Sequence, residues 1–387
     1  MAAVDGRDDV LRELRQAVAA VLAVAAFPAC ATVLPEERAD VLYHHYHGGG
    51  MDISGPSVLV RKNWRDKVSV SANYYVDSVT SASIDVMTTA SPYTEQRNET
   101  RFGVDYLHDK TVMGVSWVRS EENDYSASTA GFSFSQDFFG DLTTLNFGYA
   151  LGNDEVRRNG DPSFAEPVNR QTFNLGLAQV LSKRAVLGLA WDVTADQGYL
   201  HNAYRSVRFA DPASTLGYGY QGEVYPHTRT SNAAALRVAY HLPWQDALRA
   251  EYRIYTDTWG VGAQNLELAY TRNISPNWRI DTRVRTYSQD RADFYSDIFP
   301  YRDAQNYLAR DKELSTFDSL LFGFGASYQL KAPEASRWKQ MSFNLQLDLI
   351  QFDYADFRDV RVISAPGTEP PYGYDATVTR LYWSLWY

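Results

Sequence analysis

The sequence has very little of three features that would assign it to a familiar class. It has 1 Cys in 387 residues, which excludes a disulfide-stabilised scaffold. Its 37 basic residues are outnumbered by 47 acidic ones and form no basic block, which argues against nucleic acid as a partner. It also lacks an internal apolar run of about 18 residues, so it has no helical membrane span.

The chain is instead rich in aromatic residues, which make up 14 % of it, and Tyr is commoner than Phe. Its mean hydropathy of -0.38 is that of a water-soluble protein, and its 45 % hydrophobic content is too high for a disordered one. Tyr and Trp combine an apolar ring with a polar tip, and they gather where hydrocarbon meets water. The excess of Tyr is therefore not explained by an ordinary soluble core.

The first part of the chain has the pattern of a secretory signal peptide. An apolar stretch, residues 17–31, follows Arg12 and Arg15 and ends in a small-x-small cleavage site. We expect residues 1–31 to be this leader, and cleavage after Ala31 would remove the only cysteine. The alternative is a lipoprotein leader that is cleaved before Cys30.

From Val68 onward, apolar and polar residues alternate with a period of two, which predicts β-strands. The alternating runs last about 9–13 residues, the length that a tilted strand needs to cross a bilayer. Tight turns alternate with long polar segments, as in outer-membrane barrels. We therefore predict an all-β, antiparallel, up-and-down transmembrane barrel of about 14 strands (range roughly 12–16) in the bacterial outer membrane, with short periplasmic turns and long extracellular loops.

In this prediction the barrel occupies residues 57–387 and contacts outer-membrane lipids. Residues 32–56 would form an N-terminal segment that lies in the periplasm or partly plugs the lumen. At the other end of the chain, Leu381, Trp383, Leu385 and Tyr387 share one face, and the chain ends on an aromatic residue. This pattern predicts an assembly signal read by the barrel-assembly machinery; the alternative is an ordinary terminal strand.

Charged residues on the predicted inner face are the main functional candidates. An Arg or Lys that faced lipid at the bilayer midplane would cost about 2–4 kcal/mol, so these side chains are expected to point inward. Two interpretations stay open: an ionic ladder that fills the lumen, or a surface that selects a charged solute or docks a plug. Because both signs are present, the sequence does not specify the charge of a solute. The main set is Arg249, Glu251, Arg253, Asp257, Glu267, Arg279, Asp281, Arg283 and Arg285, with Arg101, Asp105, Asp192, Asp196, Arg237 and Asp348 as further candidates.

Three other patterns have weaker functional meaning. His44, His45 and His47 precede three glycines, so a Zn or Cu site is conceivable, although exposed histidines without a metal are common. The acidic segment 290–314 suggests a calcium site or, more simply, a solvated loop. Residues 217–222 match G-x-G-x-x-G, but no helix follows them, which argues against dinucleotide binding. We predict no resident cofactor.

The sequence offers no clear catalytic constellation. It contains no G-x-S-x-G elbow. A Ser–His pair inside the barrel, as in a lipid hydrolase, remains an alternative, and His241 is the one histidine after residue 47 on a clear strand. We therefore assign no catalytic residue and expect no enzyme activity.

Several stretches resemble a known bacterial family, domain of unknown function 3570, whose members are predicted outer-membrane barrels. The resemblance rests on residues 39–50, 55–62, 68–77, 80–86 and 310–315. It implies a porin-like barrel without established activity, and it suggests a small lipoprotein or a periplasmic redox partner. The expected role is a channel or the outer-membrane component of an export or redox assembly. A scaffold or receptor that acts through the long loops is a further alternative.

Overall fold

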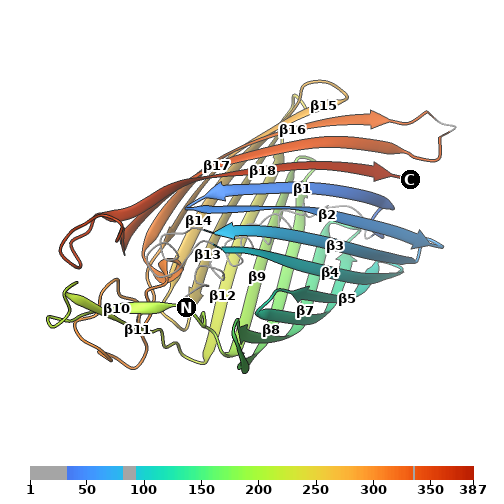
Figure 1. The fold of residues 1–387 in the computed structure, drawn as a ribbon. Coiled ribbons are helices and arrows are strands. Elements are labelled where there is room, and N and C mark those ends of the chain that lie inside the picture. Colours follow the sequence, from blue (N-terminus) through green and yellow to red (C-terminus); the bar gives the residue numbers. More distant parts are fainter. Residues whose placement is uncertain (1–32, 82–92, 334–335) are drawn as a thin grey trace.

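The computed structural model describes residues 33–81, 93–333 and 336–387 (Figure 1). The predicted leader, both of its possible cleavage sites and Cys30 lie outside these residues. In the described part of the chain, the only helix is the three-residue 3-10 turn η1, Lys312–Leu314. No helix there is long and apolar enough to cross a membrane.

The described residues form a closed barrel in which sixteen strands pair antiparallel with their neighbours. The barrel closes where the first strand pairs with the last, from Arg38 opposite Trp386 to Gly48 opposite Ala376. The strands are β1 (Arg38–Gly48), β2 (Met51–Trp64), β3 (Val68–Ser81), β4 (Tyr93–His108), β5 (Thr111–Glu121), β6 (Tyr125–Phe138), β7 (Thr143–Arg158), β8 (Asp161–Ser182), β9 (Ala185–Gly198), β12 (Thr228–His241), β13 (Ala247–Asp257), β14 (Gly262–Asn273), β15 (Trp278–Gln289), β16 (Phe317–Lys331), β17 (Gln340–Arg358) and β18 (Pro371–Trp386). This confirms the predicted fold class, with a strand number at the upper end of the expected range.

The prediction that residues 32–56 form a periplasmic or plug-like segment is wrong for most of its length. Residues 38–48 are β1, and β2 already begins at Met51. The turn between them uses Gly49 and Gly50, whose φ angles of 59° and 82° suit a tight hairpin turn. The triple glycine therefore makes a hairpin in the wall, and the barrel begins at Arg38.

Alternating exposure identifies the two faces of the wall. Large apolar side chains are exposed at every second position of most strands, for example Phe102 and Val104 in β4 and Phe322 and Phe324 in β16. Such residues suit hydrocarbon, whereas the alternate positions face the lumen. A closed barrel also leaves no unpaired strand edge in lipid. The protein is accordingly an outer-membrane barrel.

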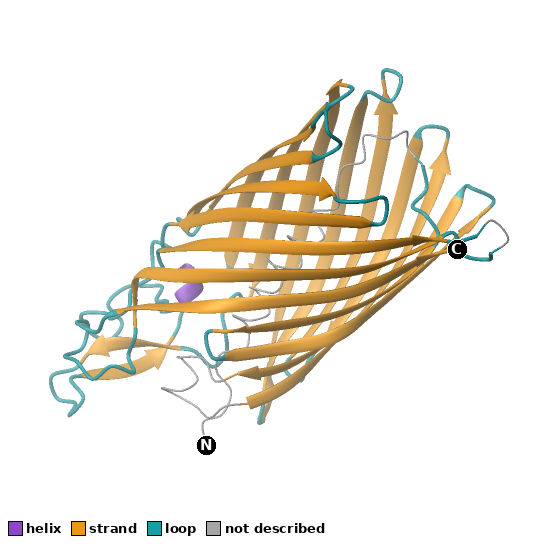
Figure 2. Ribbon diagram, turned by 90° about the horizontal axis from the view of Figure 1, so that it is seen from above, coloured by secondary structure: helices purple, strands orange, loops and turns teal. Residues whose placement is uncertain are grey.

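The connections at the two ends of the barrel differ in length (Figure 2). At the end that holds Arg38 and Trp386, most strands are joined by short turns, such as residues 65–67, 109–110 and 183–184. At the opposite end, three of the connections that the structure describes are long: residues 199–227, 290–316 and 359–370. Long loops lie outside the cell in barrels of this kind, so the chain termini of the barrel lie at the periplasmic end.

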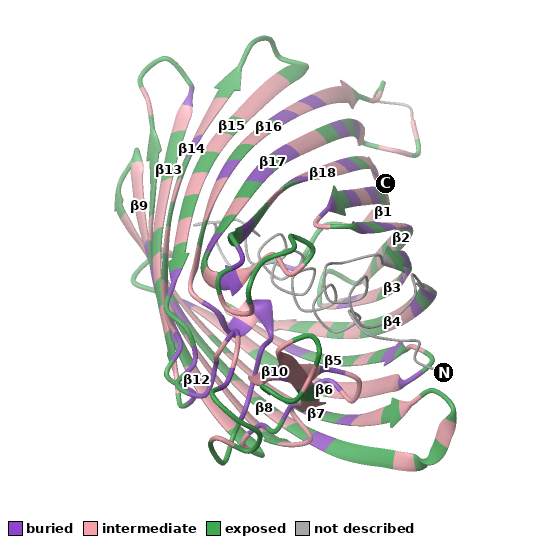
Figure 3. Ribbon diagram, turned by 60° about the vertical axis from the view of Figure 1, so that its left-hand side comes forward, coloured by how far each residue is buried: buried purple, intermediate pink, exposed green. Residues whose placement is uncertain are grey.

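The three long connections fold together into a compact unit that we call the loop cap. It contains a hairpin of β10 (Ser206–Ala210) and β11 (Tyr218–Gly222). Val207 from the first loop is buried with Phe299 and Leu308 from the second. In Figure 3 the buried segments concentrate where these loops meet the ends of the strands.

The loop cap packs against the inner wall of the barrel at its extracellular end. Tyr354 and Tyr372 have the same strand parity as the inward-facing Asp348 and Arg380, and both are buried in one cluster with Tyr295 and Leu314 of the second loop. Because these tyrosines point into the barrel, residues 290–316 lie partly inside its mouth.

Candidate functional site

The nine charged residues predicted to line the lumen all share one face of β13, β14 and β15. They alternate with exposed apolar side chains such as Leu248, Ile254, Leu268 and Val284. The side chains of a strand alternate between its two faces, so the charged set points away from lipid. The structure therefore brings this set together on one sector of the inner wall.

Ion pairs connect this sector across several strands. Asp281 accepts a hydrogen bond from Arg279 Nε at 3.3 Å and lies 3.7 Å from Arg249 Nη2. Arg253 Nη2 lies 3.2 Å from Asp192 of β9. Glu251 pairs with Arg237 of β12, and in the strand register Glu267 lies opposite Arg285. These contacts include two of the further candidates from the sequence, Asp192 and Arg237.

Asp348 lies at the centre of a second group on this wall. It accepts hydrogen bonds from Arg283 at 2.6 Å and from Arg380 at 2.8 Å. Arg283 belongs to β15 and Asp348 to β17, so their contact passes over β16. The residue of β16 beneath it is Gly323, where a Cβ atom would lie 2.5 Å from Arg283 Cγ. Gly323 is thus a structural requirement of this ion pair.

In most of the exposed pairs the arginine reaches further into water than its carboxylate. Arg249 is 44 % exposed and Asp281 29 %, and the same order holds for Arg170 and Asp196, at 37 % and 13 %. The pairs Arg61–Asp105 and Arg237–Glu251 show small differences of the opposite sense. The accessible charge on the inner wall is therefore mainly guanidinium.

Another part of the wall carries much smaller side chains. The inward positions of β5, β6 and β7 include Gly114, Ser116, Gly131, Ser133 and Gly148. Several are close neighbours: a Cβ atom on Gly131 would lie 2.6 Å from Ser116 Oγ. The inner wall thus has a sector of short, uncharged side chains on β5 to β7, whereas β4, opposite β14 in the strand order, carries the inward charges of Arg101 and Asp105.

Asp257 has a different role from the rest of the predicted set. Its side chain is fully buried and accepts hydrogen bonds from Arg229, from the hydroxyl of Tyr255 and from the backbone N–H groups of Trp259 and Val261. The expectation that it lines the lumen is not met, because these donors fix the turn between β13 and β14. The sequence pattern predicts correctly that Asp257 lies on the inner face of β13, but it does not reveal that the side chain is buried.

Buried ion pairs join the three loops of the loop cap. Arg208 of β10 donates hydrogen bonds to Asp297 at 2.5 Å and to Glu369 at 2.6 Å. Arg310 also binds Asp297, at 3.1 Å, and Arg205 pairs with Asp311. Two acidic residues of the predicted calcium loop are therefore bound to arginines, which supports a structural role for them.

The electrostatics of the loop cap follow from its burial. Burial and the nearby Asp311 raise the pKa of Glu223, although Arg205 opposes the shift. Burial lowers the pKa of Arg205, but Asp311 and Glu223 outweigh it and hold that pKa well above the ordinary value. Burial, with the charges of His227 and Arg158, lowers the pKa of His201 to about 4. The loop cap therefore keeps Arg205 charged and disfavours a charged His201.

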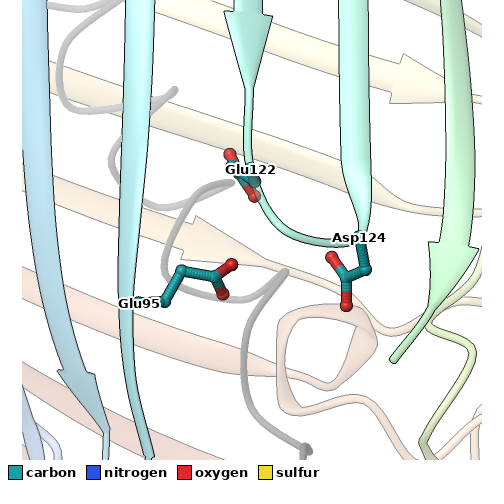
Figure 4. Close-up of side chains that lie close together, drawn as sticks. All are labelled: Glu95, Glu122 and Asp124. Atoms are coloured by element: carbon teal, nitrogen blue, oxygen red, sulfur yellow. The ribbon is translucent and has the colours of Figure 1, made fainter. Parts of the chain in front are cut away.

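One group of carboxylates that sequence patterns did not indicate has the composition of a hard-cation site. Glu95 of β4 and Glu122 and Asp124 beside the β5–β6 turn bring carboxylate oxygens within 4.8 Å of one another (Figure 4). Glu95 also accepts from the backbone N–H of Asn123 at 3.2 Å, and Asp124 accepts from the hydroxyl of Tyr204 at 2.9 Å. These bonds hold the β5–β6 turn and connect it to the loop cap. This structural role is enough to account for the carboxylates.

The three histidines named as weak metal candidates do not form one group. His44 points inward, is buried and hydrogen-bonds to Asp77 of β3 at 2.7 Å. His45 and His47 are exposed and lie on the opposite face of β1. Alternation along the strand separates them, so a site containing all three is excluded for this arrangement.

The remaining predictions have simple outcomes in the structure. Residues 218–222 form strand β11, so the glycine pattern does not precede a helix. Among the described residues, the histidine side chains hydrogen-bond to carboxylates, to Tyr75 and to one backbone carbonyl, and His241 makes only a backbone bond. The Ser–His pair of the hydrolase alternative thus finds no support. β18 pairs along its length with β17, and its role as an assembly signal stays a prediction.

Comparison with known proteins gives a family and a set of similar barrels. A family model described as "Protein of unknown function (DUF3570)" matches residues 84–170 and 165–351. The matched segments begin after most of the N-terminal stretches on which the resemblance was based. No curated protein matches the sequence.

Solved structures with a similar fold share very little sequence with this chain. A bacterial polysaccharide outer membrane secretin is 9 % identical, with 91 % of this chain and 99 % of that chain covered and a TM-score of 0.48. OpdK of Pseudomonas aeruginosa, crystallised with vanillate, is 9 % identical over 92 % of this chain and 100 % of its own, with a TM-score of 0.41. The CymD monoaromatic hydrocarbon channel is 9 % identical over 92 % and 89 %, with a TM-score of 0.43.

Proposed function

The chain belongs to the DUF3570 family, and from its inner wall we propose that it is an outer-membrane channel for small hydrophilic anions. The observation that carries this proposal is the partial exposure of the inward-facing arginines. Arg249 and Arg279 are 44 % and 42 % exposed, and they share the less exposed Asp281 between them. Water therefore reaches these side chains inside the barrel.

Electrostatics make this wall favour anions over cations. Two guanidinium groups around one carboxylate leave a net positive charge at this position. A unit charge about 4 Å away contributes about 1 kcal/mol even in bulk water, equivalent to roughly a fivefold preference. The Gly and Ser sector on β5 to β7 adds no charge, and β4, opposite β14 in the strand order, carries inward charges of both signs. A small anion passing along the arginine sector would therefore be stabilised relative to a cation.

The proposal is tested by ion selectivity in planar lipid bilayers. The purified chain is reconstituted, and its zero-current potential is measured in a KCl gradient. We expect a permeability ratio that favours chloride. The double variant Arg249→Gln/Arg279→Gln removes two charges and should reduce the ratio by roughly 25-fold, about fivefold for each arginine, as estimated from the Coulomb energy.

A control variant removes an arginine from the outer face of the barrel instead of the lumen. Arg119 lies on the outward face of β5, next to Glu121, and is also about half exposed. Arg119→Gln should leave the permeability ratio unchanged. A parent channel that prefers potassium would contradict the proposal of an anion channel, and so would a permeability ratio that is the same in the parent and in the lumen double variant. Absence of any conductance would show that the barrel is not an open channel.

A further inference from the structure

The outer surface of the barrel carries a cluster of two imidazoles and one carboxylate that the channel does not use. His45 and His47 are two residues apart on β1 and project from the same face as the exposed Val41 and Tyr43. Asp52 of β2 lies directly opposite His47 in the strand register. This face of β1 is the outward one, so the cluster lies on the outside of the barrel wall.

The height of the cluster follows from the strand direction. β1 starts at the periplasmic end, and its turn to β2 lies at the end with the long loops. The apolar residues of this face stop at Tyr43, and His45 and His47 follow. The cluster therefore lies just beyond the apolar belt, at the extracellular boundary of the membrane, where water reaches it.

We propose that His45, His47 and Asp52 form a binding site for a divalent transition-metal ion such as Zn²⁺. Imidazole nitrogen together with carboxylate oxygen is a donor set that suits Zn²⁺, Cu²⁺ and Ni²⁺. His44, which the sequence groups with the other two, is not part of this site because it points into the barrel. The carboxylate ligand comes from the neighbouring strand, which the spacing of the histidines does not reveal.

The distances bring these donors close to the spacing of metal ligands. His45 Nε2 lies 2.7 Å from Asp52 Oδ1, and His47 Nδ1 lies 2.8 Å from Oδ2. Two ligands of one tetrahedral Zn²⁺, each about 2.0–2.1 Å from the metal, lie about 3.3 Å apart. Each nitrogen-to-oxygen distance therefore has to lengthen by less than about 1 Å to match the spacing of two zinc ligands.

Closing the site requires the two imidazoles to approach each other. Their ring centroids are 6.5 Å apart and the rings are inclined by 32°. Both side chains are exposed, His47 by 68 %, so rotation about their side-chain bonds is not opposed by packing. Three protein ligands leave at least one position of the ion open to water at the membrane surface.

The test measures Zn²⁺ binding to the tag-free, full-length protein in detergent micelles after chelator treatment. Isothermal titration should show one ion bound per chain. His47→Ala should weaken binding by more than about tenfold, because even the loss of a residue that hydrogen-bonds to a metal ligand costs about that much. The double variant His45→Ala/His47→Ala should abolish binding. Replacement of Zn²⁺ by Co²⁺ should give visible absorption bands that disappear in the double variant.

Two control variants separate this site from other donors. His108 is an exposed histidine beside Asp109 at the opposite end of the barrel, and His108→Ala should bind Zn²⁺ as the parent does. Glu122→Gln alters the buried carboxylate group and should also have no effect. The heat-dependent gel mobility of each variant reports that the barrel has folded. Lack of saturable binding by the parent, or binding that survives in the double variant or is lost in Glu122→Gln, would overturn the proposal.

Discussion

Arg208 is the side chain on which the loop cap depends most directly. It is 1 % exposed and binds Asp297 in one loop and Glu369 in another. If Arg208→Ala is introduced, Asp297 keeps its contact with Arg310. Glu369, however, retains only backbone N–H donors among its described contacts: that of Gly367, at 2.8 Å, and its own. The substitution would therefore leave a buried carboxylate without a cation.

The size of the effect follows from the cost of such a charge. Breaking a buried ion pair by removing one partner costs about 3–5 kcal/mol. We expect the lower end, about 3 kcal/mol, because Asp297 remains paired. A free energy of this size corresponds to a more than hundredfold rise in the population of the opened cap. The barrel strands should be largely unaffected, because over most of their length they hydrogen-bond to neighbouring strands.

Hydrogen–deuterium exchange with mass spectrometry measures this opening directly. Peptides from residues 199–227 and 290–316 should exchange faster in Arg208→Ala, while peptides from β13 and β14 keep their protection. Arg302→Ala is the matched control. Arg302 lies in the same cap, but it is exposed, and its ion pair with Asp303 is a long one of 3.8 Å that contributes little to stability. The double variant Arg208→Met/Glu369→Gln removes the carboxylate charge together with the arginine. Its cap should therefore keep part of the protection that Arg208→Ala loses. Unchanged exchange in Arg208→Ala, or the same acceleration in Arg302→Ala, would refute the reasoning.

Two more predictions concern pH and the barrel wall. The pKa of His201 falls from 6.5 in the unfolded chain to about 4 in the cap, so its contribution to stability is complete above pH 6.5 and is lost as the pH falls toward 4. Hydrogen exchange of the cap should rise in that window, and His201→Phe should remove this dependence; a profile identical to the parent's would contradict it. Gly323→Ala should lower the free energy of unfolding by about 1–3 kcal/mol, because the new methyl group meets Arg283 at 2.5 Å, whereas the nearest atom to a Cβ on Gly325 is 3.4 Å away. Urea unfolding of both variants in detergent measures this difference, and equal losses would disprove the role of Gly323.

The sequence could predict the barrel and the inner face because both follow from the same period of two. It missed β1 because His45 and His47 occupy outward positions where the pattern expects apolar residues. It also missed the start of β2, where Gly55 and Pro56 interrupt the strand pattern; the backbone carbonyl of Val76 occupies the space that a Cβ of Gly55 would need. In each case a local exception hid a strand that pairs with both of its neighbours, although Gly55 and Pro56 have no partner in β3.

The loop cap could not be predicted from the sequence because its contacts are not local. Arg208 and Glu369 are 161 residues apart, and Val224 pairs with Leu308 through an isolated bridge. No periodic pattern in either loop indicates these partners. Acidic residues in the second loop therefore suggested a calcium site or a solvated surface, whereas arginines from other loops neutralise two of them. Burial of one chain segment by another is what decides between these roles.

The same difference in burial explains why arginine–carboxylate pairs serve two purposes in one chain. In the loop cap both members of the Arg208 pairs are buried, so no solute can reach the charges and the pairs only hold loops together. On the inner wall the guanidinium of most pairs is more exposed than its carboxylate, so the pair still acts on a passing ion. The net charge of -10 counts both kinds of pair equally, together with every exposed carboxylate of the loops. It therefore gives no indication of solute charge, which depends on how far each partner is exposed along the lumen.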